Sequence, residues 1–235
     1  MRLDGLWYSC RHLPRRLFKS VDDALMPLRC VFCGTRTVGD ERFVCAGCRA
    51  DLPWLESARS PAPSPVTSMV APLAYEFPVD AALKALKFKR RLYYAPAFGD
   101  FLCDAMRFVP ADIDALLPVP LHWRRLALRG FNQALEISQA IRRSYKLPLV
   151  TGVVRRRATS PQSGLSAAER RSNVRHAFAV RRGLTARHVL IVDDVVTTGA
   201  TTRQLGRSLL DNGVEKVSVL AVAKATQAGS AGLNV

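Results

Sequence analysis

The chain has 235 residues, of which 49% are hydrophobic, so it can bury a full core and disorder throughout is excluded. Lysine and arginine number 35 against 19 aspartate and glutamate, and the resulting net charge of +16 favours a polyanionic partner, nucleic acid first. No apolar run reaches the roughly 18 residues of a membrane span and the first twenty residues lack a secretory signal, so we expect a cytoplasmic protein without a membrane span.

Four cysteines follow the N-terminal segment in the pattern Cys30-x2-Cys33-x11-Cys45-x2-Cys48. Each pair can present two thiolates from one tight turn, and two such turns close a tetrahedral site of four sulfur ligands. The spacing predicts a structural zinc site, with a redox dithiol as the alternative. Four protein ligands leave no open coordination position, so zinc would stabilise the segment without catalysing a reaction. Residues 35–44, between the pairs, predict a short hairpin.

The composition along the chain predicts four parts. Residues 1–57 would hold an N-terminal helix near 13–25 and the cysteine module. Residues 58–65, where proline alternates with other residues, read as a stiff linker. Residues 66–225 would form the main domain, and residues 226–235 a C-terminal tail.

Strand-like and helical patterns alternate in the main domain. Strands are expected over 66–75, 113–119, 189–192 and 217–222, and helices over 79–89, 94–108, 131–145 and 201–212. This alternation predicts a parallel α/β sheet with helices on both faces. Ligands of such sheets bind beyond the carboxyl ends of the strands.

The strand over 189–192 leads directly into two carboxylates, Asp193 and Asp194, and then a threonine-rich loop. The loop reads Val195-Val196-Thr197-Thr198-Gly199-Ala200-Thr201 and precedes a helical pattern. Carboxylates suit vicinal sugar hydroxyls, and backbone N–H groups at a helix N-terminus suit a phosphate. The stretch therefore predicts a sugar-phosphate site. Helix capping by the acids is the alternative, but two acids and four threonines exceed what a cap needs.

Residues 189–201 resemble the phosphoribosyl pyrophosphate (PRPP) binding motif of type I phosphoribosyltransferases. The chain as a whole resembles the ComF family of competence-associated, phosphoribosyltransferase-like proteins. The motifs that carry this wider resemblance are the four cysteines, Leu86-Lys87-Phe88-Lys89, Pro118-Val119-Pro120-Leu121, Arg129-Gly130-Phe131-Asn132-Gln133-Ala134, Gln162-Ser163-Gly164-Leu165, Arg170-Arg171-Ser172-Asn173-Val174 and the PRPP loop.

The resemblance implies a parallel sheet of the type I phosphoribosyltransferase fold, with the small four-cysteine module attached at its N-terminus. In that fold Asp193 and Asp194 would hold the ribose hydroxyls, residues 195–201 would wrap the 5-phosphate, and Mg²⁺ would accompany PRPP. The candidates for the pyrophosphate loop and the flexible loop are Lys87, Pro120, Leu121, Arg129, Gln162, Ser163, Arg170 and Asn173. No catalytic residue is identified, and His122 is either a general base or a packed histidine.

Two functions stay open. In the first, a PRPP-binding protein acts in natural transformation and DNA uptake, handling single-stranded DNA in the cytoplasm together with DNA-processing proteins. The basic cluster over 84–94 suits the phosphates and bases of a single strand, although Tyr94 also fits a core position. The arginines of 124–129 could neutralise pyrophosphate or a nucleic-acid phosphate, and those of 155–178 form a plausible phosphate track. The alternative is an active, Mg²⁺-dependent phosphoribosyltransferase of nucleotide metabolism, whose acceptor the sequence does not reveal.

Overall fold

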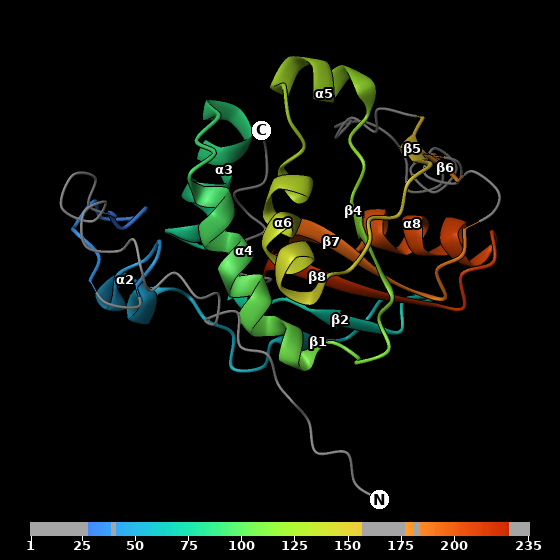
Figure 1. Ribbon diagram of the computed structural model, residues 1–235, viewed down its shortest axis with the longest axis horizontal. Helices are drawn as coiled ribbons and strands as arrows, with labels where there is room; N and C mark the ends of the chain where they lie inside the picture. The colour runs from blue at the N-terminus through green and yellow to red at the C-terminus, as the bar shows by residue number, and fades with distance from the viewer. Residues whose placement is uncertain (1–27, 39–40, 157–176, 181–183, 226–235) are drawn as a thin grey trace, which may run out of the picture.

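A six-stranded, mostly parallel sheet forms the centre of the protein (Figure 1). The computed structural model describes residues 28–38, 41–156, 177–180 and 184–225, so the helix expected near 13–25 lies outside it. The sheet contains β1 (Arg59–Ser60), β2 (Ser68–Val70), β3 (Leu73–Ala74), β4 (Ala115–Pro118), β7 (His188–Val196) and β8 (Lys216–Lys224). Its order is β1-β2-β8-β7-β4 with β3 also beside β8, and every pair except β1–β2 is parallel.

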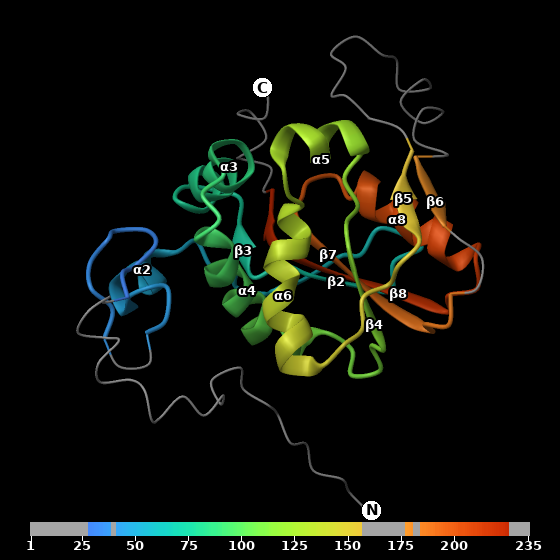
Figure 2. The same cartoon turned by 45° about the horizontal axis from the view of Figure 1, so that its top comes forward.

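Helices cover both faces of this sheet, which confirms the expected α/β arrangement (Figures 1 and 2). The helices are α2 (Ala46–Asp51), α3 (Val79–Lys89), α4 (Tyr94–Ala105) with the 3-10 turn η1 (Met106–Phe108), α5 (Trp123–Arg129), α6 (Gln133–Tyr145) and α8 (Ala200–Leu210). Along β7, Leu190 and Val192 share a core with α3, α4 and α6, whereas Val189 and Ile191 share the other core with α8. This alternation is the period of two that a strand imposes.

Several elements differ from the sequence prediction, and three of the differences have a clear physical reason. The strand expected over 66–75 is split into β2 and β3, and Pro72, which has no N–H to donate, lies in the gap. Near the cysteines, residues 35–38 and 41–44 contain no strand of the expected hairpin, whose turn lies outside the described residues, and Arg36 forms an isolated bridge with Arg29 across the first cysteine turn. Helix α5 was not expected: none of its residues is buried, so it has no core-facing stripe of apolar residues to detect.

A second, two-stranded sheet joins β5 (Val153–Arg155) to β6 (Phe178–Val180) in antiparallel register. The two strands flank residues 157–176, which lie outside the described residues. The flexible-loop candidates Gln162, Ser163, Arg170 and Asn173 fall in that range. Among the described helices, none is long and apolar enough to cross a membrane.

The cysteine module packs against α4. Arg49 donates to Asp104 over 2.5 Å, and the rings of Trp54 and Phe101 meet edge to face with centroids 5.3 Å apart. Cys30, Val44 and Leu52 are buried in the same core as α4. The module is therefore joined to the main core by apolar packing as well as by an ion pair.

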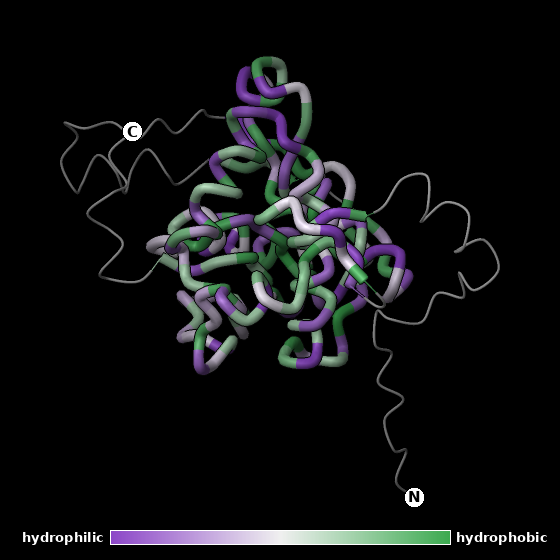
Figure 3. The backbone as a smooth tube through the Cα atoms, turned by 90° about the vertical axis from the view of Figure 1, so that its left-hand side faces the viewer, coloured by the Kyte–Doolittle hydropathy of each residue, from purple (hydrophilic) through white to green (hydrophobic). Residues whose placement is uncertain are grey.

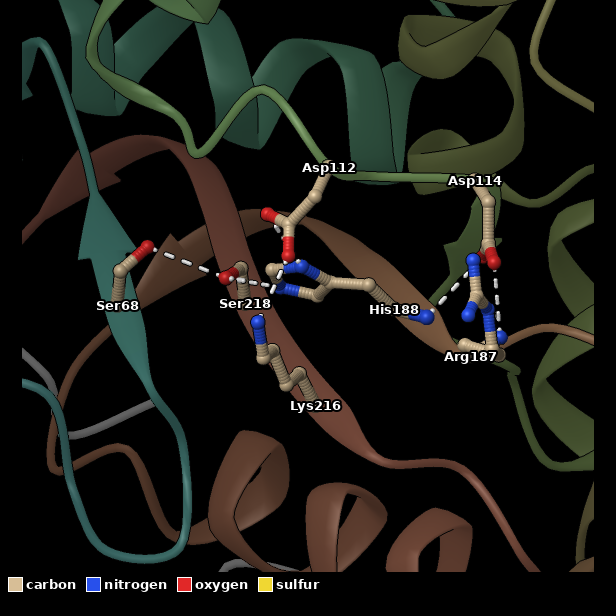
Figure 4. Close-up of polar contacts among 7 residues, drawn as sticks. All are labelled: Ser68, Asp112, Asp114, Arg187, His188, Lys216 and Ser218. Carbon is tan, nitrogen blue, oxygen red and sulfur yellow. Dashed lines mark hydrogen bonds and ion pairs between the residues drawn. The ribbon is translucent and has the colours of Figure 1, made fainter.

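A network of polar side chains crosses the edge of the sheet at which the parallel strands begin (Figure 4). The buried ring of His188 contacts the Asp112 carboxylate through Nδ1 and the Ser218 hydroxyl through Nε2, each over 2.9 Å. The Ser218 hydroxyl in turn lies 3.2 Å from that of Ser68. Ser218 is fully buried, so this Asp–His–Ser arrangement has no substrate access and ties β2, β7 and β8 together instead.

Candidate functional site

The two acids lie on β7 and point to opposite sides of the sheet. The alternation that sends Val192 toward α3 and α6 does the same for Asp194, and Asp193 faces the α8 side with Ile191. Both are buried, with exposed fractions of 9% for Asp193 and 4% for Asp194. Buried carboxyl groups require partners, and the structure supplies different partners on the two sides.

Asp194 is held by side chains of two helices. Lys87 of α3 forms an ion pair with its Oδ2, and Gln133 of α6 donates from Nε2 to its Oδ1 over 3.1 Å. Arg129, at the end of α5, donates to Oε1 of Gln133 over 2.5 Å. Gln133 is placed at the start of α6 because Asn132 caps that helix, accepting from the backbone N–H of Ala134.

The electrostatic environment separates the two carboxyl groups. Burial and the neighbouring charge of Asp194 raise the pKa of Asp193 well above its usual range. Burial also disfavours ionisation of Asp194, but Lys87 and the hydrogen bond from Gln133 outweigh it and lower the pKa of Asp194. Burial opposes the charge on Lys87 as well, and Asp194 outweighs it and raises the pKa of Lys87. The arrangement is thus a buried Asp194–Lys87 ion pair beside a carboxyl group whose charged form is disfavoured.

The threonine loop closes the α8 side of the site. A hollow of ≈ 50 Å³ is lined by Asp193 and residues 195–202. Gly199 has a φ of +70°, precedes α8 and lies so close to Pro63 that an added Cβ would come within 2.8 Å of Pro63 Cγ. The first N–H groups of an α-helix have no partner inside the helix, and α8 has no acidic residue in its first turn. The loop therefore offers donors and a positive helix end to an anion.

The loop after β4 lies next to the acids. Pro118 pairs with Val192 in parallel register, and Val119 donates to the Val192 carbonyl over 2.9 Å, so residues 120–122 follow beside Asp193. His122 is buried and its Nδ1 accepts from the backbone N–H of Arg124, which makes it the cap of α5 and a packed histidine. The backbone of Arg155 of β5 forms an isolated parallel β-bridge with that of His122. Burial lowers the pKa of the Arg155 guanidinium, as does Arg125, and Asp193 acts in the opposite direction.

The four cysteines converge as their spacing predicts. Their sulfur atoms all lie within 4.8 Å of one another, and Sγ of Cys33 is 3.7 Å from Sγ of Cys45. A tetrahedral zinc with bonds of about 2.3 Å places its sulfur ligands about 3.8 Å apart, so the geometry fits. Hydrogen bonds with Thr35 lower the pKa of the Cys33 thiol to about 6, whereas burial raises the pKa of the Cys48 thiol. This four-cysteine group can bind a metal such as zinc.

The structure brings several of the predicted site residues together. Asp193 and residues 195–201 line one hollow, and Lys87 and Arg129 reach Asp194 directly or through Gln133. Pro120 and Leu121 lie in the adjacent loop. Gln133 was not singled out as a site residue, although it stands inside the Arg129–Ala134 motif. Its role depends on a contact with a residue 61 positions away, which a single sequence does not display.

The fold and the site define the class: an α/β protein with buried acids and a threonine loop at the carboxyl edge of its sheet, joined to a four-cysteine module. No family model matches the chain. It is 36% identical over 163 residues to DNA utilization protein YhgH of Escherichia coli O157:H7, covering 67% of this chain and 72% of that protein. It is also 39% identical over 160 residues to competence protein F of Haemophilus influenzae, covering 64% of this chain and 70% of the relative. Competence protein ComFC of Bacillus subtilis matches at 29% over 132 residues, which are 56% of this chain and 53% of that protein. The chain therefore belongs to the ComF family.

Proposed function

We propose that this chain binds PRPP or a related sugar phosphate, using residues 66–225 as a type I phosphoribosyltransferase fold. The observation that carries the proposal is the joining of two buried, adjacent acids to a threonine loop at the N-terminus of α8. Asp193 and Asp194 would take the vicinal hydroxyls of the ribose, and residues 195–201 would take its phosphate. Carboxyl oxygens accept hydrogen bonds from hydroxyl groups, so two adjacent acids suit two neighbouring hydroxyls.

The proposed biological role is DNA uptake in natural transformation. It rests on relatives named competence protein F, competence protein ComFC and DNA utilization protein, and on a net charge of +16. Single-stranded DNA in the cytoplasm is the proposed partner, with DNA-processing proteins acting alongside. A surplus of positive charge strengthens binding to a polyanion, because contacts with its phosphates release condensed counterions.

The proposed Mg²⁺ would bind together with PRPP. Asp194 already contacts Lys87 and Gln133, so we propose that Mg²⁺ is held largely by the phosphate oxygens of PRPP and by water. The ion would neutralise the pyrophosphate charge. The four-cysteine site would hold zinc as a structural metal, well away from the sugar-phosphate site in sequence and on a different element.

Isothermal titration calorimetry with PRPP and Mg²⁺ tests this proposal. Asp193→Asn removes a carboxyl group with little change in shape, and Thr198→Val removes an exposed hydroxyl of the loop. The charged form of Asp193 is disfavoured, and a hydrogen bond between neutral groups contributes about 0.5–1.5 kcal/mol, so Asp193→Asn should weaken binding about 2- to 13-fold. Asp211→Asn, at the exposed far end of α8, is the matched control and should bind as the wild type does. Absence of heat with the wild-type protein would contradict the proposal.

Transfer of the phosphoribosyl group is the second candidate function. One observation favours it: the loop over 119–122 begins beside Asp193, where a departing pyrophosphate would need donors. Release of pyrophosphate from PRPP and Mg²⁺, above that seen with Asp193→Asn, would support transfer when a nucleobase or an oligonucleotide is supplied as the acceptor. Release equal to that background would leave binding as the function.

A further inference from the structure

The C-terminal end of α3 and helix α5 are joined into one exposed surface. We call it the α3–α5 surface and define it by Phe88, Arg90, Arg91, Trp123, Arg124 and Leu128. Arg90 donates from Nη2 to the Leu128 carbonyl over 3.1 Å, although the two residues are 38 positions apart. The Arg129 guanidinium lies 5.5 Å from the centre of the Phe88 ring. Two basic clusters that are separate in the sequence are therefore continuous in the fold.

Large apolar side chains are exposed on this surface. Phe88 is 73% exposed, Trp123 65% and Leu128 81%. Single exposed apolar residues are ordinary, but three on α5 and the end of α3 that adjoins it form a feature that requires a reason. Figure 3 shows α5 at the top of the molecule, where hydrophobic and hydrophilic stretches alternate and the body of the protein lies below. None of the residues of α5 is buried, so the helix contributes little to the core and is available to a partner.

The charge of the surface is of one sign. Residues 84–93 and 119–135 contain eight lysine and arginine residues and no aspartate or glutamate. The cations lie against the rings: the Arg124 guanidinium is 5.3 Å from the Trp123 ring centre, as Arg129 is near Phe88. A membrane-binding helix separates an apolar face from a basic one and is usually much longer than the seven residues of α5. Rings and cations side by side match a chain that alternates bases and phosphates.

We propose that the α3–α5 surface is the docking site for a single-stranded polynucleotide, whose bases stack on Phe88 and Trp123 and whose phosphates contact the neighbouring arginines. The choice of partner rests on the proposed function. The position of the surface also links it to the sugar-phosphate site, because Lys87 precedes Phe88 and contacts Asp194, and Arg129 contacts Gln133. A polynucleotide bound to this surface would therefore contact residues that neighbour the partners of Asp194.

Fluorescence anisotropy with a labelled oligothymidylate of about 20 nucleotides tests this on the full chain. Stacking of one base on one ring corresponds to a factor of about 5 to 140 in affinity, so Phe88→Ala and Trp123→Ala should each weaken binding by that factor. Phe77→Ala, which removes an equally exposed ring at the other end of α3, should have no effect. A duplex of the same length should bind the wild type less tightly, because its bases are not free to stack on the rings.

The salt dependence tests the arginines separately. Each phosphate contact on a single strand contributes about −0.7 to the slope of log K against log salt, so Arg91→Gln with Arg124→Gln should reduce the slope by about 1.4. Arg142→Gln with Arg143→Gln, two exposed arginines at the far end of α6, should leave it unchanged. Equal loss in both pairs would mean that charge alone matters and would overturn the proposal.

Two further measurements separate the remaining outcomes. PRPP affinity should be unchanged in Phe88→Ala and Trp123→Ala. Conversely, Asp193→Asn should lose affinity for PRPP and keep its affinity for DNA. These two results together would show that the two sites bind their ligands independently. A different result would overturn the proposal: the wild type binds vesicles containing phosphatidylserine, and the ring variants abolish that binding without changing DNA affinity. The surface would then be a membrane contact. All five ring, arginine and control variants change only exposed side chains, and thermal melts will establish that each is folded.

Discussion

Lys87→Met is the perturbation that the structure defines most sharply. It removes the ammonium group that faces Asp194 and keeps most of the length and apolar surface of the side chain. Two adjacent buried carboxyl groups are then left without their cation. Removing one partner of a buried ion pair costs about 3–5 kcal/mol, and for a chain of this size that corresponds to a fall in Tm of about 6–20 °C.

The pH dependence follows from the directions of the pKa shifts. The raised pKa of Lys87 gives stability that is present below the unfolded value of about 10.4 and is lost as pH rises through the folded pKa. The lowered pKa of Asp194 gives stability that is present above about 3.9 and is lost as pH falls through the folded pKa. The wild-type pair is therefore intact between about pH 5 and 8.

In Lys87→Met, the pKa of Asp194 should rise, because burial is no longer offset by the ammonium group. The stability deficit should then be small at pH 5, where the carboxyl group takes a proton, and larger at pH 8. Urea unfolding followed by tryptophan fluorescence at the two pH values measures it. Lys84→Met, which breaks an exposed pair with Asp80 one turn earlier on α3, should cost about 0.5 kcal/mol or less at both. A deficit below about 1 kcal/mol, or one independent of pH, would refute this reasoning.

Two further predictions concern the metal and the loop. The purified protein should contain one zinc per chain by elemental analysis; Cys45→Ser should lose it and lower Tm, Cys103→Ser should retain it, and a folded cysteine module without any metal would contradict the assignment. Gly199→Ala should lower the free energy of unfolding by about 1–2 kcal/mol because of the left-handed backbone, and by a further amount because the added Cβ approaches Pro63. It should also weaken PRPP binding, which calorimetry measures. Gly213→Ala, with a φ of +97° and open space around its Cβ, carries the backbone cost alone, so equal losses of stability in the two variants would argue against a crowded loop.

Much of this fold could be predicted because its elements follow the local rules of periodicity. The four apolar residues before Asp193 identify a buried strand, and the cysteine spacing identifies a site whose geometry the structure reproduces. Helix α5 escaped prediction because its signals were polar: a histidine cap at His122 and a left-handed Gly130 after its last residue. A helix with no buried residue has no core-facing apolar period to detect.

The partners of the site residues were beyond the sequence for a different reason. Strand alternation could place Asp193 and Asp194 on opposite faces, but the identity of the side chain opposite each depends on how α3 and α6 pack. Lys87 was expected to contact pyrophosphate or the flexible loop, and the structure shows it paired with Asp194. The chain of His188, Asp112 and Ser218 was unpredicted for the same reason, since its members are brought together by the sheet.

The position of β8 in the sheet has a consequence for synthesis of the protein. It is the last described strand in sequence, yet it lies between β2 and β7. Until residue 224 has been made, β2 cannot pair with β8, and β7 exposes one long, apolar edge. Such an edge invites pairing with another chain. The nascent protein would therefore depend on late closure of the sheet or on chaperones that cover the gap, and truncations that reach into β8 should lower the yield of folded protein.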